Sequence, residues 1–373
     1  MSREEFSSLL YQTRIDSSTT SEVAIERLTP LRNWIKQNIP SKLYRYRNVS
    51  DYSISALEND EIWGSTIFTF NDPYECTPCY NIDETFNYLK IMLSPEIMHQ
   101  NFTALSRGDI TPPIQLGIQS DAIEELQKNV KAIPEGELLP QIKFAIDQLF
   151  DRIVAEWNPI TSEFFTGLQT AESEVHIACF SEIGDSSLMW GHYADRHKGF
   201  CLEYDFSSAL QDCNMNCSSP AQCNNFLLNL PIAPVTYSPE RFNASLHLVT
   251  VIQDYLRRSL QAPVNIFLYD MLLVAKCQLM KSCDWSYEKE WRLAWRKPSD
   301  KYEAYRCITH LKPSAIYLGS RMSSDDQTRI FEISQQKEIP CFKMLQNYTG
   351  QDYTLIPQSY EEYLAITQQF KNR

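Results

Sequence analysis

HIACFSEIGDSSLMWGHYADRHKGFCLEYDF, residues 176–206, is the stretch that decides the predicted fold. Apolar residues alternate with the other face from Val175 to Cys179, which predicts a strand that ends at Ser181. The turn that follows offers helix N-caps, and residues 187–197 suit a short helix. Alternation resumes from Phe200 to Phe206, so the stretch predicts a strand, a short helix and a second strand.

The connection between these two strands is unusually rich in polar and aromatic side chains. Trp190, His192 and Tyr193 fall within the predicted helix. His192 and Tyr193 are candidates to stack on a ligand or hydrogen-bond to it, although a lone His or Tyr in a helix is more often structural. Gly199 follows where a left-handed residue commonly ends a helix.

Composition and charge limit the classes of protein that fit. The chain has 373 residues and a formal net charge of −13, so phosphate backbones repel it at long range. It lacks a run of about 18 apolar residues, so we predict no membrane span. The N-terminus lacks an apolar signal region, and we expect a cytoplasmic protein.

Eleven cysteines form no regular framework, and in the cytoplasm we expect reduced thiols. Cys76 and Cys79 form one pair, and Cys213, Cys217 and Cys223 form a cluster. Neither is accompanied by a second regular ligand pair, as a closed zinc site usually is. We therefore predict no metal site.

Hydrophobic periodicity divides the chain into a sheet domain with helical additions. The predicted α+β core is interrupted by a helical insertion and flanked by helices. The predicted segments are an N-terminal helical flank (1–40), the first part of the core (41–83), the insertion (84–173), the second part of the core (174–350) and a C-terminal helix (351–373).

Two carboxylates enter a late strand in the sequence KSCDWSYEKEWRLAWR, residues 281–296. If the chain is extended from Glu288 onward, Glu288, Glu290 and Arg292 share one face. Such a pair can supply a general base and an electrostatic stabiliser of a cation. The alternative is a solvated acidic turn in which Arg292 is an ordinary ion-pair partner.

Arginines and a turn precede the insertion. In LYRYR, residues 43–47, Arg45 and Arg47 share one face and Tyr44 lies on the other. Guanidinium groups match phosphate oxygens bidentately, so these arginines are candidates for holding a diphosphate; the alternative is a surface strand. Asn71 and Asp72 are further candidates, although Asn-Asp-Pro also suits a simple turn.

Several segments together resemble the bacterial family called domain of unknown function 2971. They are LYRYR (43–47), IWGSTIFTFNDPYE (62–75), the segment from CFSE to LMWGHYADRHKGFCLEYD (179–205), and WSYEKEWRL (285–293). The resemblance covers roughly residues 41–76 and 176–320 and leaves the insertion and both ends unmatched. Membership of this family would imply no particular activity.

The order of elements is more distantly similar to the ADP-ribosyltransferase superfamily, which splits NAD between two small sheets. The resemblance implies that Arg45 holds NAD phosphate or ribose and that Tyr193, after the strand ending at Ser181, stacks on nicotinamide. It implies that Glu290, with Glu288, contacts the nicotinamide ribose and stabilises an oxocarbenium-like transition state.

We therefore expect a split, mostly antiparallel ADP-ribosyltransferase-like core and an enzyme that uses NAD as substrate. A bacterial toxin or phage-defence effector is the expected setting, with a macromolecular acceptor, protein or nucleic acid, and a possible neutralising or sensor partner. The alternatives are a nucleotide-sensing or partner-binding module on the same fold and a nucleic-acid-processing effector. No dinucleotide-binding, P-loop, zinc-protease or nucleophile-elbow motif is present to favour other chemistry.

Overall fold

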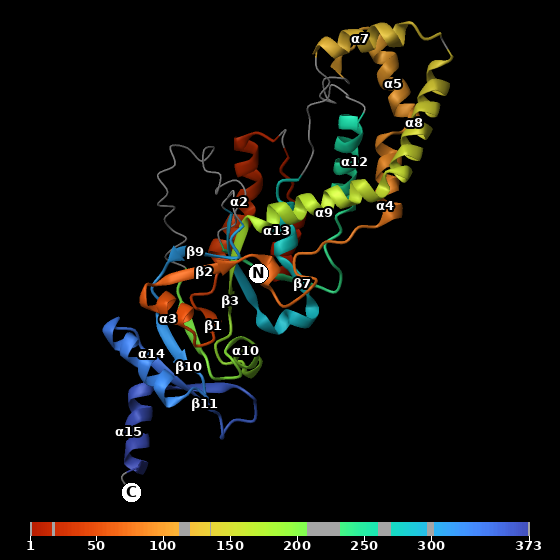
Figure 1. The fold of residues 1–373 in the computed structure, drawn as a ribbon. Helices are drawn as coiled ribbons and strands as arrows, with labels where there is room; N and C mark the ends of the chain where they lie inside the picture. The colour runs from red at the N-terminus through yellow and green to blue at the C-terminus, as the bar shows by residue number, and fades with distance from the viewer. Residues whose placement is uncertain are drawn as a thin grey trace.

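The computed structural model describes residues 2–16, 19–111, 120–134, 136–206, 232–259, 270–296 and 302–371. It is a mixed α+β fold with a mostly antiparallel open sheet and helical flanks, as expected (Figure 1). The strands are β1 (Leu43–Arg47), β2 (Glu61–Ser65), β3 (Val175–Ser181), β4 (Phe200–Tyr204), β5 (Ile232–Pro234), β6 (Thr236–Ser238), β7 (Met280–Ser282), β8 (Glu290–Arg296), β9 (Tyr305–His310), β10 (Ala315–Leu318), β11 (Cys341–Gln346) and β12 (Leu355–Ser359).

Helices flank this sheet at both ends of the chain and between its strands. They are α1 (Arg3–Gln12), α2 (Ser21–Asn38), α3 (Asp51–Glu58), α4 (Ile82–Met92), α5 (Pro95–Ser106), α7 (Ser120–Lys131), α8 (Leu138–Ala155), α9 (Trp157–Ser173), α10 (Ser187–Tyr193), α12 (Ser245–Ser259), α13 (Leu273–Gln278), α14 (Ser324–Gln336) and α15 (Tyr360–Lys371), with short 3-10 helices η1 (Ile67–Thr69) and η3 (Cys283–Glu288).

The main sheet runs in the order β12-β11-β10-β4-β1-β3-β2-β9, and β8 and β5 branch from β3. Its described pairings are antiparallel except the one between β10 and β11. Strands β6 and β7 form a separate parallel pair. Helix α14 connects the parallel neighbours β10 and β11, and the helical segment before β3 connects the antiparallel neighbours β2 and β3.

Strand β3 is the fork of the sheet. Along one edge it pairs with β8 over its whole length. Its other edge is shared, because β1 joins it through Tyr44 at Ser181, whereas β2 joins it through Ser65 at Ile177. Strands β1 and β2 therefore diverge beside the middle of β3.

Two apolar cores cover the opposite faces of this fork. On one face Ala178 and Phe180 of β3 and Trp291 of β8 pack in a core shared with α1, α2 and α14. On the other face Val175 and Ile177 pack in a core shared with α9, α12 and α13. Successive residues of β3 therefore face two different cores, and because both cores are apolar, both faces of this strand carry apolar side chains.

The residues of 84–173 that the structure describes contain helices and no strand. Figure 1 shows α5, α7 and α8 extending away from the sheet, and α9 returning toward β3. The apolar positions Ile142, Ile146 and Ile153 are buried on α8, as their spacing predicts. Trp157, which the same spacing adds to this helix, instead begins α9.

Three further details differ from the sequence-based expectations. Residues 355–359 form β12 before the C-terminal helix, because they pair with β11. The left-handed residues after α10 are Asp195, Arg196 and His197. Gly199 is needed for another reason, since a Cβ there would lie 2.1 Å from the carbonyl oxygen of Arg47.

Two expectations concern cysteines and membranes. The cluster at Cys213, Cys217 and Cys223 lies outside the described residues. Cys76 is buried and Cys79 is half-buried, and both are free thiols. No helix in the described ranges is long and apolar enough to cross a membrane.

Candidate functional site

A cavity of about 460 Å³ lies at the fork of the sheet, between β1, β3, α10 and the segment that joins η3 to β8. Its volume falls within the range of small-molecule sites. Nine of the twelve residues that the sequence suggests for a site line it: Tyr44, Arg45, Arg47, Asn71, Ser181, His192, Tyr193, Glu288 and Glu290. The residues named from distant parts of the chain thus share one cavity.

A buried lysine joins the two glutamates. The ammonium of Lys281 lies 2.7 Å from Oε2 of Glu288 and 3.3 Å from Oε2 of Glu290. Lys281 also lines the cavity, and none of the three side chains is more than about a tenth exposed. A cation held between two carboxylates is stable in a buried site only because each charge is compensated.

Local backbone structure brings Glu288 and Glu290 together, although not as an extended pair. Glu288 ends the 3-10 helix η3, and Lys289 adopts a left-handed conformation with φ of 43° before β8 begins at Glu290. The hydroxyl of Ser181 donates a hydrogen bond of 2.6 Å to the carbonyl of Glu288, which fixes this turn against β3. The expectation that Glu288 belongs to the strand is therefore wrong, because the chain kinks at Lys289.

The two carboxylates differ in their electrostatic surroundings. Burial raises the pKa of Glu288, and the neighbouring charge of Glu290 raises it further. Burial opposes ionisation of Glu290 as well, but Arg292 and Lys281 outweigh it and lower the pKa of Glu290 to about 2. Neighbouring acids whose pKa values are pushed apart commonly have separate acid–base and electrostatic roles.

Arg292 does not line the cavity, but it contacts Glu290, which does. Its guanidinium is 1% exposed and bonds Oε1 of Glu290 at 2.8 Å and Oε1 of Glu75 at 2.7 Å. The sequence predicts that Arg292 contacts a cofactor; in this structure it does not line the cavity and bonds Glu290 and Glu75. It anchors Glu290 instead.

Tyr193 reaches the carboxylate pair from α10. Its phenol donates a short hydrogen bond to Oε1 of Glu288, and burial together with the charge of Glu288 raises the pKa of Tyr193. His192 beside it is exposed at the cavity. Trp190 does not line the cavity: it is fully buried, packs edge-on against Tyr46 and donates a hydrogen bond to the carbonyl of Gly184. These contacts of Trp190 hold α10 against β1 and against the turn that precedes the helix.

The arginines of β1 lie on the other side of the fork. Because side chains alternate along a strand, Arg45 and Arg47 project with Phe180, whereas Tyr44 projects with Ser181. The guanidinium carbon of Arg45 is 5.6 Å from the ring centre of Phe180, and its Nη2 donates to the carbonyl of Trp63. Burial and then Arg47 lower the pKa of Arg45 to about 10, so it stays protonated at neutral pH.

Neither arginine is neutralised by a carboxylate. Among the described residues, no ion pair joins Arg45 or Arg47 to an Asp or Glu side chain. Within the described part of the chain the two arginines therefore lack a carboxylate at ion-pair distance, and both also line a small cavity that contains Glu61.

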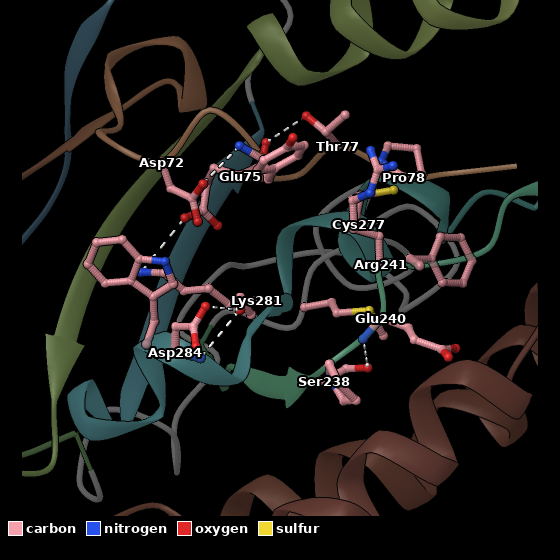
Figure 2. Close-up of a pocket in the computed structure, with 16 residues that line it drawn as sticks. Asp72, Glu75, Thr77, Pro78, Ser238, Glu240, Arg241, Cys277, Lys281 and Asp284 are labelled. Carbon is pink, nitrogen blue, oxygen red and sulfur yellow. Dashed lines mark hydrogen bonds and ion pairs between the residues drawn. The ribbon is translucent and has the colours of Figure 1, made fainter.

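A second cavity, of about 410 Å³, shares Lys281 with the first, and Figure 2 shows the residues that line it. Asp72 lines this cavity and not the first, and its Oδ1 accepts a hydrogen bond from the backbone nitrogen of Tyr74. Asp72 therefore closes a turn, as the sequence allowed. Glu75 lines the same cavity and is joined to Lys281 by an ion pair of 3.7 Å (Figure 2).

Lys281 and Glu75 are the site residues that sequence reasoning missed. Glu75 and its partner Arg292 are 217 residues apart in sequence, and Lys281 lies outside the strand that carries Glu290. No local pattern marks such long-range contacts. In the sequence, Lys281 is marked only by its position in the segment 281–296, which also contains Glu288 and Glu290.

Comparison with known proteins adds one finding. The family model described as "Protein of unknown function (DUF2971)" matches residues 189–293. The matched segment contains Tyr193, Lys281, Glu288 and Glu290, so it covers the carboxylate side of the cavity and not β1. Neither the curated proteins nor the solved structures searched gave a match.

Proposed function

We propose that this protein cleaves NAD and transfers its ADP-ribose to an acceptor. The observation that carries the proposal is a single cavity with two opposite kinds of charge. Arg45 and Arg47 lack carboxylate partners on one side of the fork, whereas Glu288 and Glu290 lie on the other side. NAD has a matching division, because its diphosphate is anionic and its glycosidic carbon becomes cationic in the reaction.

The ligand would pass through the fork of the sheet. In this arrangement Arg45 and Arg47 bind the diphosphate, since guanidinium groups match phosphate oxygens in pairs. The nicotinamide ribose lies toward Lys281 and the carboxylates, and the rings of Tyr193 and His192 offer a platform for nicotinamide. Asn71 and Tyr44 complete the wall.

The two carboxylates have different roles in the proposed reaction. The bond between the ribose carbon and the nicotinamide nitrogen breaks, and nicotinamide leaves with the electron pair. Glu290, which stays anionic, stabilises the oxocarbenium ion electrostatically. The acceptor then forms a bond to that carbon, and its proton passes to Glu288, whose raised pKa suits a general base.

Release of nicotinamide from NAD is the direct test. We expect the wild-type protein to release nicotinamide and to label a component of cell extract when the adenylate phosphate of NAD carries the label. Glu288→Gln keeps the shape of the side chain and removes the base, so the rate should fall by about 10²- to 10⁴-fold. Glu362→Gln, an exposed position on α15, is the matched control and should behave as wild type. Equal rates in wild type and Glu288→Gln would contradict the proposal.

One observation favours a second function, a nucleotide-binding module that does not turn NAD over. Both oxygens of Glu290 are already bonded by Arg292, at 2.8 and 3.1 Å, which leaves little capacity for a ribose hydroxyl. Calorimetric titration of NAD distinguishes the two functions. Binding that Arg45→Met and Arg47→Met abolish, without nicotinamide release by any variant, would support the binding module.

A further inference from the structure

Three potential metal ligands converge at the β9 edge of the sheet, outside the two larger cavities. Glu61 begins β2, and Cys307 and His310 belong to the edge strand β9. One ligand atom from each side chain lies within 4.8 Å of the other two. None of the three lines the cavity at the fork or the cavity beside it.

A β-bulge creates this convergence. Cys307 and His310 are three residues apart, so in a regular strand their side chains would point to opposite faces. Glu61 pairs with His310 and Trp63 pairs with Cys307, and the register shifts by one residue between these pairs. The extra residue turns both side chains toward Glu61. Bulges commonly re-aim side chains in this way.

The contacts of Cys307 and His310 at the cluster are long: the Cys307 thiol donates a 3.7 Å hydrogen bond to the carbonyl of Thr309, and His310 forms an ion pair with Glu61. The Nε2 atom of His310 and Oε1 of Glu61 are 3.7 Å apart, which is too long for a hydrogen bond. Oε2 of Glu61 accepts a hydrogen bond of 2.9 Å from the indole of Trp63, so the carboxylate is oriented with Oε1 toward the histidine. A neighbouring donor that orients a ligating group is a usual feature of metal sites.

We propose that Glu61, Cys307 and His310 bind a zinc ion. Thiolate, imidazole and carboxylate together suit Zn²⁺ better than the hard cations Mg²⁺ or Ca²⁺. With metal–ligand distances of about 2.0 to 2.3 Å, tetrahedral ligand atoms lie roughly 3 to 4 Å apart, so small side-chain movements complete the site. Three protein ligands leave one position for water. His310 is 68% exposed in its side chain, so the ion has access from solvent.

The ion would link β2 to β9 across their bulged pairing and would protect the sheet edge. The thiol of Cys307 must lose its proton to bind the ion. Binding is therefore expected to strengthen as the pH rises. None of the three ligands lines the cavity at the fork, although Glu61 shares a small neighbouring cavity with Arg45 and Arg47.

Metal titration of the purified full chain tests the proposal. After dialysis against a chelator, Co²⁺ serves as the spectroscopic probe, and Zn²⁺ is then titrated in competition with a chromogenic chelator. We expect one tight equivalent and a sulfur-to-cobalt charge-transfer band in the near ultraviolet. Cys307→Ser should remove that band, and His310→Ala should weaken Zn²⁺ binding by at least about tenfold.

Cys283→Ser is the matched control, because Cys283 is an exposed free thiol outside the cluster. This variant should keep the band and the affinity. Far-ultraviolet circular dichroism checks that each variant folds, and Glu61→Gln provides a third ligand change if one cysteine variant fails. A band that survives Cys307→Ser, or an affinity equal in wild type and the Cys307→Ser/His310→Ala double variant, would overturn the proposal.

Discussion

The phenol of Tyr193 donates a hydrogen bond to Oε1 of Glu288 and thereby joins the short helix α10 to the kink before β8. The two residues are 95 positions apart in sequence. On its other oxygen Glu288 contacts Lys281, so the carboxylate is held from both sides. This contact closes one wall of the cavity and sets the electrostatic state of its proposed base.

Tyr193→Phe should slow NAD cleavage and shift its pH profile. Hydrogen bonds to a charged group are worth about 1.5 to 3 kcal/mol, which corresponds to a loss of roughly tenfold or more in kcat/KM. The Tyr193 hydroxyl lowers the pKa of Glu288 against burial and Glu290, so its removal raises that pKa. The acidic limb of the kcat/KM profile should therefore move to higher pH; an unshifted limb would exclude this role.

Arg292→Leu should destabilise the fold severely. It leaves the buried carboxylates of Glu290 and Glu75 without their guanidinium partner, and breaking such a buried pair costs about 3 to 5 kcal/mol. Urea denaturation measures the free energy of unfolding. Arg296→Leu on the same strand is the control: its bond to Glu174 is partly exposed, and we expect a loss of at most about 1 kcal/mol.

Glu172→Gln should remove a pH dependence of stability. Burial raises the pKa of Glu172 from its ordinary value of 4.5 to about 8, and its Oε1 has no hydrogen-bond partner among the described residues. The folded state therefore binds a proton that the unfolded state releases above pH 4.5. The contribution of this bound proton to the free energy of unfolding is complete below pH 4.5 and is lost as the pH rises through 8.

Wild type should accordingly lose stability between pH 5 and pH 8 relative to Glu172→Gln, as measured by urea midpoints at each pH. Glu163→Gln lies on the same helix in a surface ion pair and should follow the wild-type curve. Parallel curves for wild type and Glu172→Gln would show that Glu172 does not hold an extra proton in the folded state.

Gly199→Ala should destabilise the strand that follows α10. The added Cβ would lie 2.1 Å from the carbonyl oxygen of Arg47, and such overpacking costs about 1 to 3 kcal/mol. Gly191→Ala is the control, since nothing lies within 4 Å of its Cβ and alanine favours a helix. Thermal unfolding should rank Gly199→Ala below wild type and Gly191→Ala at or above it. The reverse order would exclude the close contact between β1 and β4 as the reason for this glycine.

Local patterns were sufficient for much of the fold. Alternation predicted β3 and β4, and cap residues predicted α10, because each of these signals depends on neighbours within one turn or two strand positions. The predicted strand through Glu288 failed at Lys289, whose left-handed backbone no propensity indicated. β12 was missed because its pairing with β11 defines it.

The sequence by itself determined the residue types of the cavity: the arginines of β1, Tyr193 of α10 and the glutamates before β8. It determined them because each belongs to a short segment whose composition departs from an ordinary surface. The tertiary structure alone decided how these groups are used. Only the fork at β3 places the arginines and carboxylates on one cavity, and only burial beside Lys281 and Arg292 makes Glu290 a fixed anion and Glu288 the easier proton acceptor. Charge compensation in a buried site depends on distances between segments far apart in the chain, which no local pattern encodes.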